Sequence, residues 1–269
     1  MYGDDKMKIK GKNVIVTGAA SGVGKELTKQ LLKKGCNVAG IDINNDTLKL
    51  LEEELNSKKL KTYVVDMGSS DSIKKFREEY KKDYSDVDII INNAGIIQPF
   101  VNVENLDDAT INKVMNVNFF GPVNLIRYFM EDLTKDRSEQ YIVNVSSMGG
   151  FFPFPGQTIY GASKAALKIF TEGLYAELER TNVRVMIVLP GAMNTNITKN
   201  SNVEVKSSKE ESPLKLLEAD VAAYKIIEAM EKNKFKLFLG NDAKFLRFLY
   251  KINSKFAISY INKKMSGIK

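Results

Sequence analysis

The sequence contains no histidine and only one cysteine. Without histidine, Ser-His-Asp and Cys-His nucleophilic systems, histidine general bases and the common histidine-bearing zinc sites are excluded. We therefore expect no metal centre. Cys36 cannot form an internal disulfide, which fits a reducing compartment. The missing histidine excludes more functions than any other feature of the composition.

Long apolar runs are also missing. The first ten residues, MYGDDKMKIK, lack the apolar segment of a secretory signal. No later stretch offers the roughly 18 consecutive apolar residues that a membrane span requires. These absences predict a cytoplasmic protein.

The net charge of +7 is confined to the C-terminus. Residues 232–269 hold ten Lys/Arg against one acidic residue, so the rest of the chain carries about −2. A nucleic-acid reader would instead interleave basic and aromatic residues over its core surface. We expect no nucleic-acid partner.

Short β-branched runs alternate with helical patterns along the chain, which has 269 residues and 43% hydrophobic side chains. This alternation predicts one α/β domain, residues 1–269, with a parallel sheet covered on both faces. The polar stretch 199–212 has no periodicity and is expected to be a loop. The predicted strands are 13–17, 37–41, 62–65, 87–91, 141–145, 183–189 and 236–239, and the predicted helices are 22–34, 46–56, 70–82, 109–133, 158–180 and 213–232.

A glycine-rich segment, residues 17–24, joins the first predicted strand to the first helix. Glycines there allow a backbone to approach a pyrophosphate, with the helix N-terminus facing the anion. Asp42 follows about 20 residues later, where a carboxylate can accept hydrogen bonds from an adenosine ribose and repel a 2′-phosphate. No Lys or Arg lies within 19–21 or 43–45. Alternatively, the glycines and Asp42 serve only as turn residues.

Tyr160 and Lys164 lie four residues apart on a predicted helix and so project from one face. A tyrosine has a pKa near 10, so exchanging protons near neutrality requires a stabilised phenolate. An adjacent ammonium and a cationic nicotinamide ring are suited to that task. The pair alone is weak evidence, because this spacing recurs by chance on ordinary helices.

The order and spacing of several motifs make the pair specific. These motifs are, in order, the glycine loop, Asn92-Asn93-Ala94-Gly95, Asn118, Ser147, Tyr160-Gly161-Ala162-Ser163-Lys164 and Pro190-Gly191. With them, across roughly residues 10 to 195, the chain resembles the short-chain dehydrogenase/reductase family. The resemblance implies a Rossmann-type, doubly wound parallel sheet of about seven strands and an NAD(P)-dependent oxidoreductase.

The resemblance also implies a role for each matching position. Tyr160 would deliver the proton, Ser147 would polarise the substrate oxygen, Lys164 would bind the nicotinamide ribose and lower the tyrosine pKa, and Asn118 would hold a relay water. Ser147 is preferred over Ser146 because the family places its serine thirteen residues before the tyrosine. The expected cofactor contacts are Gly18, Ser21, Gly22, Val23, Gly24, Asp42, Asp66, Met67, Asn93, Ala94, Gly95, Tyr160, Lys164, Pro190, Gly191 and Thr195.

Together these features predict hydride transfer between NAD(H) and an alcohol or carbonyl substrate. Three phenylalanines within 151–154 favour an apolar substrate, although they would also suit the core or a subunit interface. A catalytically silent NAD-binding sensor, a sugar epimerase or dehydratase and an enoyl reductase are the rival functions. The resemblance further suggests a homodimer or homotetramer, built through the helices that start near Ala109 and Thr158.

The C-terminal segment, residues 241–269, predicts an amphipathic helical extension. Its basic residues fall on one helical stripe and its apolar residues on another. We expect the apolar side to cover the substrate pocket or a partner subunit. Contact with an anionic membrane surface is the alternative.

Overall fold

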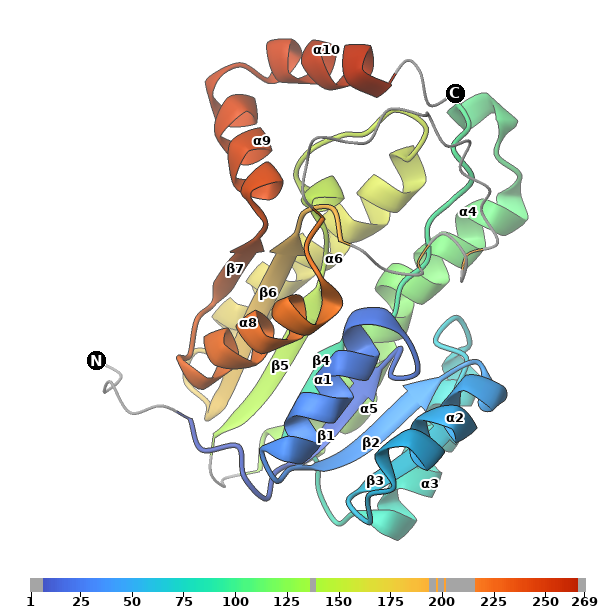
Figure 1. Cartoon of the computed structure of the whole chain (residues 1–269), viewed down its shortest axis with the longest axis vertical. Coiled ribbons are helices and arrows are strands. Elements are labelled where there is room, and N and C mark those ends of the chain that lie inside the picture. Colours follow the sequence, from blue (N-terminus) through green and yellow to red (C-terminus); the bar gives the residue numbers. More distant parts are fainter. Residues whose placement is uncertain (1–6, 136–138, 194–196, 198–200, 202–215, 266–269) are drawn as a thin grey trace.

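The computed structural model describes residues 7–135, 139–193, 197, 201 and 216–265. Seven parallel strands form one sheet in the order β3-β2-β1-β4-β5-β6-β7 (Figure 1). The predicted Rossmann-type fold is thereby confirmed. The strands are β1 (Asn13–Thr17), β2 (Asn37–Asp42), β3 (Leu60–Val64), β4 (Ile89–Asn92), β5 (Gln140–Val145), β6 (Val183–Pro190) and β7 (Lys236–Leu239).

Helices cover both faces of this sheet. One face packs against α1 (Gly22–Lys33), α2 (Asn45–Leu55) and α8 (Ala219–Glu231). The opposite face packs against α3 (Ser70–Asp83), α5 (Gly121–Leu133) and α6 (Thr158–Glu177). The remaining helices are α4 (Asp108–Met115), α9 (Asn241–Ile252) and α10 (Ser254–Met265).

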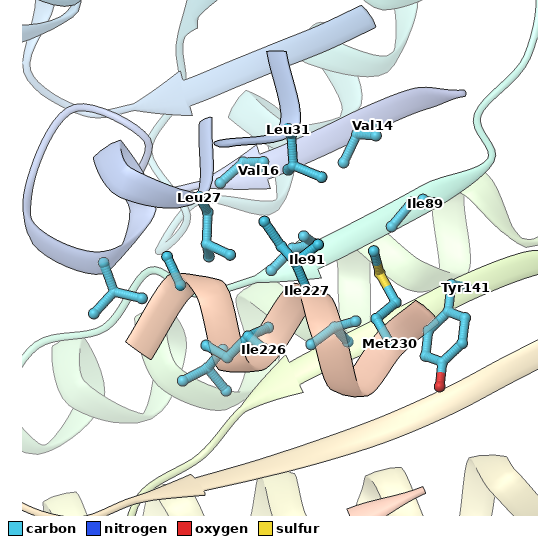
Figure 2. Close-up of a cluster of buried hydrophobic side chains, with 14 of the residues drawn as sticks. Val14, Val16, Leu27, Leu31, Ile89, Ile91, Tyr141, Ile226, Ile227 and Met230 are labelled. Atoms are coloured by element: carbon cyan, nitrogen blue, oxygen red, sulfur yellow. The ribbon is translucent and has the colours of Figure 1, made fainter. Parts of the chain in front are cut away.

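Alternate residues of each central strand enter different cores, which explains why these strands are almost wholly apolar. In β1, Val14 and Val16 join the cluster under α1 and α8, whereas Ile15 joins the cluster on the other face. Figure 2 shows Val14 and Val16 in one cluster with Leu27 and Leu31 of α1 and Ile227 of α8. Burying each such side chain stabilises the fold by roughly 1.5–3 kcal/mol.

Most predicted boundaries agree with the structure to within two residues. β3 begins at Leu60 rather than at residue 62, because Leu60 already pairs with Val38. β4 begins at Ile89 rather than at 87, because the preceding Asp88 carboxylate accepts a hydrogen bond from the backbone N–H of Asn13. α8 begins at Ala219, later than predicted. Except for residue 201, the expected loop 199–212 lies outside the described residues.

The predicted helix 109–133 is interrupted. A π-helical turn, Asn116–Phe120, separates α4 from α5. Apolar periodicity does not distinguish a π turn from regular helix, so this turn is not apparent in the sequence.

The strand order reverses between β1 and β4, which leaves a crevice at their carboxyl ends. Thr17 joins the two sides of this crevice. Its hydroxyl oxygen accepts hydrogen bonds from the N–H groups of Asn93 at 2.9 Å and Ala94 at 2.8 Å. Ligands of open α/β sheets bind at such a reversal.

Candidate active site

The side chains of Tyr160 and Lys164 come from the first turns of α6. Buried Gln98 fixes the start of this helix. Its Oε1 accepts hydrogen bonds from the N–H of Ile159 at 2.8 Å and of Tyr160 at 3.0 Å. These N–H groups lack partners within the helix, so Gln98 acts as a cap contributed from a distant loop.

The two neighbouring serines have different surroundings. Ser147 Oγ accepts a hydrogen bond from the N–H of Gly149 at 3.0 Å and also bonds to the Tyr160 side chain. The buried Ser146 hydroxyl instead donates to the carbonyl oxygen of Lys164 at 2.8 Å. Ser147, not Ser146, therefore lies at the tyrosine hydroxyl.

Asn118 is buried in the π-helical turn and is held by three hydrogen bonds. Its Nδ2 donates to the carbonyl oxygen of Ile96 and to Ser163 Oγ, and its Oδ1 accepts from the N–H of Ile96. π turns are frequent at functional sites. Here the turn places the side-chain amide of Asn118 beside α6.

Two glycines show how close these groups are. A Cβ added to Gly95 would lie 3.0 Å from Lys164 Nζ and 3.2 Å from Asn118 Oδ1. A Cβ added to Gly149 would lie 3.3 Å from Tyr160 Cε1 and 3.5 Å from Ser147 Oγ. The four predicted catalytic side chains are therefore brought together by α6, β5 and the π turn.

Burial controls the proton affinity of the pair. It raises the pKa of the Tyr160 phenol, and the hydrogen bond with Ser147 partly opposes this rise. Burial also lowers the pKa of Lys164 to about 8, and Lys164 Nζ donates to the carbonyl oxygen of Val145 at 3.1 Å. The tyrosine can ionise near neutrality only if positive charge gathers around it.

The glycine loop has the geometry of a dinucleotide cradle. Gly18 has a φ of +67°, and a Cβ on Gly24 would overlap the carbonyl oxygen of Gly18. The first turn of α1 contains no acidic residue, and the Ser21 side chain does not cap it. The N–H groups of that turn, including those of Gly22 and Val23, therefore face no competing carboxylate.

Asp42 stands at the end of β2, beside this loop. Its Oδ2 accepts a hydrogen bond from the N–H of Ala20 at 3.2 Å, and its Oδ1 accepts from the N–H of Asn44 at 3.2 Å. Exposed Asp66 binds the N–H of Gly68, while Met67 is buried in the core. These residues, with the loop, fit the adenosine half of a nicotinamide dinucleotide.

Pro190 is the last residue of β6, and Gly191 follows it. Asp242, at the start of α9, accepts a hydrogen bond from the N–H of Ala192 at 2.7 Å. A Cβ on Gly191 would overlap the Asp242 carboxylate. Thr195, the expected carboxamide contact, lies outside the described residues.

The phenylalanines of the loop before α6 contact the C-terminal extension. Phe152 is buried with Leu246 of α9 and Ala257 of α10, and its ring lies 5.5 Å from that of Tyr250. Phe151 and Phe154 are only partly buried. Phe152 is therefore a packing residue, as one of the sequence interpretations allowed.

Sequence reasoning missed Gln98, Asp242 and the π turn. Gln98 belongs to no motif, and its importance arises only when residue 98 meets the start of α6. The acidic character of Asp242 among basic residues was the one available sign, since a lone carboxylate in a basic segment often has a specific partner.

A dinucleotide cradle at the sheet reversal beside a Tyr-Lys pair defines a Rossmann-type oxidoreductase site. The family model described as short chain dehydrogenase matches residues 12–206. The chain belongs to this family.

Two curated relatives and one solved structure illustrate the similarity. The 3-oxoacyl-[acyl-carrier-protein] reductase of Thermotoga maritima is 36% identical over 194 residues, which cover 71% of this chain and 78% of the relative. The 3-ketodihydrosphingosine reductase of Bacteroides thetaiotaomicron is 31% identical over 220 residues, covering 82% and 77%. A short chain dehydrogenase from Burkholderia cenocepacia in complex with NADP has a TM-score of 0.78 and 26% identity, covering 95% of this chain and 99% of that one.

Proposed function

We propose that this protein interconverts an alcohol and a carbonyl compound with NAD(H), using Tyr160 as its proton-transfer residue. The observation that carries the proposal is the convergence of Ser147, Tyr160, Lys164 and Asn118 around Gly95 and Gly149. A hydroxyl pair beside a buried lysine is suited to holding and moving one proton at a substrate oxygen.

When bound, the nicotinamide group supplies or accepts the hydride. Tyr160 holds the proton at its phenolic oxygen and gives it to the substrate oxygen during reduction. Ser147 Oγ already accepts from Gly149, so its O–H is directed to an oxygen partner and favours developing negative charge there. In this proposal a charged Lys164 beside the bound nicotinamide would favour the phenolate of Tyr160, and Asn118 would hold a water that returns protons to Lys164.

The remaining predicted contacts would hold the cofactor. Asp42 supports NAD rather than NADP, because its carboxylate would repel a 2′-phosphate and no Lys or Arg stands within 43–45 to offset it. The Burkholderia cenocepacia protein was solved with NADP, so family membership alone does not decide this choice. The proposal therefore depends on Asp42.

The substrate is proposed to be apolar. Met148, Phe151 and Phe154 lie partly buried in the loop between Ser147 and Tyr160. Both curated relatives are named for reducing a 3-oxo or 3-keto compound. An apolar ketone, or the matching secondary alcohol, fits both observations.

We also propose a homodimer or homotetramer. Phe120 in the π turn and Ile169 on α6 are large exposed hydrophobic residues on the two helical segments expected to form the contact. Light scattering of the purified protein measures the state directly. A protein that stays monomeric at all concentrations would contradict the proposed oligomer.

A panel of ketones and secondary alcohols of increasing chain length, read by cofactor absorbance, tests the activity. We expect turnover with NAD(H) that improves with apolar chain length. NADH binding without turnover of any compound would instead identify a silent NAD-binding sensor. Turnover confined to small polar substrates would reject only the apolar class.

A further inference from the structure

The C-terminal extension, α9 and α10, has three distinct faces. On its inner face Leu246 and Ala257 are buried against Phe152 of the loop before α6, and Ala243 is buried as well. That the extension covers the substrate pocket or a partner subunit stays a prediction. Figure 1 shows both helices projecting from one end of the molecule, beyond β7.

The inner face leaves much of the apolar surface uncovered. Phe245, Phe248 and Ile252 share a second face of α9, because they are spaced three and four residues apart. Phe248 is 64% exposed and Ile252 is 66% exposed. Phe256 and Ile258 of α10 are exposed as well. Soluble protein surfaces rarely expose so many large apolar side chains together without a partner.

A third face is basic. Lys244 and Lys251 lie on α9 beside this exposed apolar face, and exposed Lys255 and Lys263 follow on α10. Within 148–157 and 232–265, the segments that meet in this extension, Asp242 is the only acidic residue. Asp242 is engaged with the N–H of Ala192. The exposed surface is therefore apolar and strongly cationic.

We propose that this surface docks on an anionic lipid bilayer. An amphipathic helix with aromatic and aliphatic residues next to lysines inserts its apolar face at the level of the headgroups, while the lysines meet the lipid charge. Pairing two copies of the same surface would instead set lysine against lysine, and the one acidic residue of these segments, Asp242, is already engaged with the N–H of Ala192. Charge complementarity thus selects the bilayer over a second copy.

Such docking fits the rest of the molecule. In the part of the chain that the structure describes, no helix is long and apolar enough to span a membrane. Contact would therefore be peripheral. It would also bring the loop carrying Met148 and Phe154 close to the bilayer, although the docking itself does not depend on the proposed reaction.

Vesicle co-sedimentation of the full chain tests the proposal. One set of vesicles contains phosphatidylcholine alone, and the other contains phosphatidylcholine mixed with phosphatidylglycerol. We expect binding to the mixed vesicles that weakens with added salt, and at least about tenfold weaker binding to phosphatidylcholine alone.

Two variants separate the apolar and charged contributions. Phe248→Ser/Ile252→Ser alters only exposed side chains, and Lys244→Glu/Lys255→Glu places acids near helix N-termini, where they suit the helix dipole. Each should reduce partitioning at least about tenfold. The matched control Lys49→Glu/Leu50→Ser changes an exposed basic-apolar pair on α2 and should bind like the wild type.

Several results would overturn the proposal. One is that the intact protein fails to bind the mixed vesicles, or binds them no better than phosphatidylcholine alone. Another is that both variants bind the mixed vesicles as well as the wild type does. A patch variant that splits an oligomer while vesicle binding is absent would assign the surface to a second copy. Circular dichroism and thermal melting confirm folding, and the charge variant remains informative if the apolar variant unfolds.

Discussion

In the proposed function, the choice between NAD(H) and NADP(H) depends on the carboxylate of Asp42. It stands at the end of β2 and accepts hydrogen bonds from the N–H groups of Ala20 and Asn44. Replacing Asp42 by Ala should narrow the preference for NAD(H) over NADP(H) by about 1–3 kcal/mol, because ribose binding and phosphate repulsion are both lost. The ratio of kcat/KM for the two cofactors measures the effect.

Asp42→Asn serves as the control for charge. It removes the negative charge but keeps an acceptor oxygen for one of the two N–H groups, so it should move the preference in the same direction and disturb the loop less than alanine does. A wild-type enzyme that uses NADP(H) equally well or better would reject the assignment.

Burial of Lys164 imposes a stability cost that depends on pH. Its pKa falls from 10.5 to about 8 on folding, which amounts to roughly 3 kcal/mol against the folded state below pH 8. Between about pH 8 and 10.5 the unfolded chain binds more protons at this lysine, so the cost diminishes as the pH rises.

Lys164→Met should therefore stabilise the cofactor-free protein by about 1–3 kcal/mol at pH 7, after loss of the hydrogen bond to Val145. The gain should shrink between pH 8 and 10.5, as measured by urea unfolding, while activity is lost. Lys168→Met is the matched control and should give no gain in stability, because Lys168 is partly exposed and paired with Glu172. A gain that stays constant over this pH range would contradict the cost assigned to Lys164.

Individual residues were predictable from the sequence where a motif fixes their spacing. Tyr160 and Lys164 lie one turn apart on α6, and Ser147 stands thirteen residues before Tyr160, so the spacing in the motifs identified all three. Gln98 was not predictable, because its role depends on a contact between segments about 60 residues apart.

At the scale of elements, the start of α6 is held by Gln98. Gln98→Ala leaves the N–H groups of Ile159 and Tyr160 without their acceptor. We expect kcat to fall about tenfold to a hundredfold, because small displacements of a reacting group have effects of this size. The dissociation constant for NADH should change by less than about twofold, which distinguishes positioning from general unfolding.

Two further variants, one at residue 98 and one at the neighbouring Gln157, serve as controls for Gln98→Ala. Gln98→Glu retains the acceptor at the helix N-terminus but loses the Nε2 donor to the carbonyl oxygen of Gly156, so it should recover part of kcat. Gln157→Ala removes a donor to the Gln98 backbone but spares the Gln98 side chain, so its effect should be smaller. Equal losses in all three variants would show that Gln98 only supports folding.

Strands were predicted best where a short apolar run lies between turns. β1 and β7 match their predicted bounds for this reason. The π turn was not predictable, and neither was the choice of which apolar residues of α9 are buried. Leu246 and Phe248 are similar in type, yet one is buried and the other exposed, and only packing against Phe152 separates them.

At the scale of the whole molecule, the strand order determines where the proposed site lies. The strand order reverses between β1 and β4, the point at which ligands of open α/β sheets bind, and the segment after β5, α6 and the π turn bring the four proposed catalytic side chains together. The sequence order of the motifs predicted this assembly, because parallel strands bring their carboxyl ends to one edge of the sheet.

The most direct test of the central claim is kcat of Tyr160→Phe, measured beside its NADH dissociation constant. The substitution removes the phenolic proton and little packing area. The proposed chemistry predicts a fall in kcat of about two to four orders of magnitude, with NADH affinity within about twofold of wild type. Retention of more than about a tenth of wild-type kcat would contradict proton transfer by Tyr160.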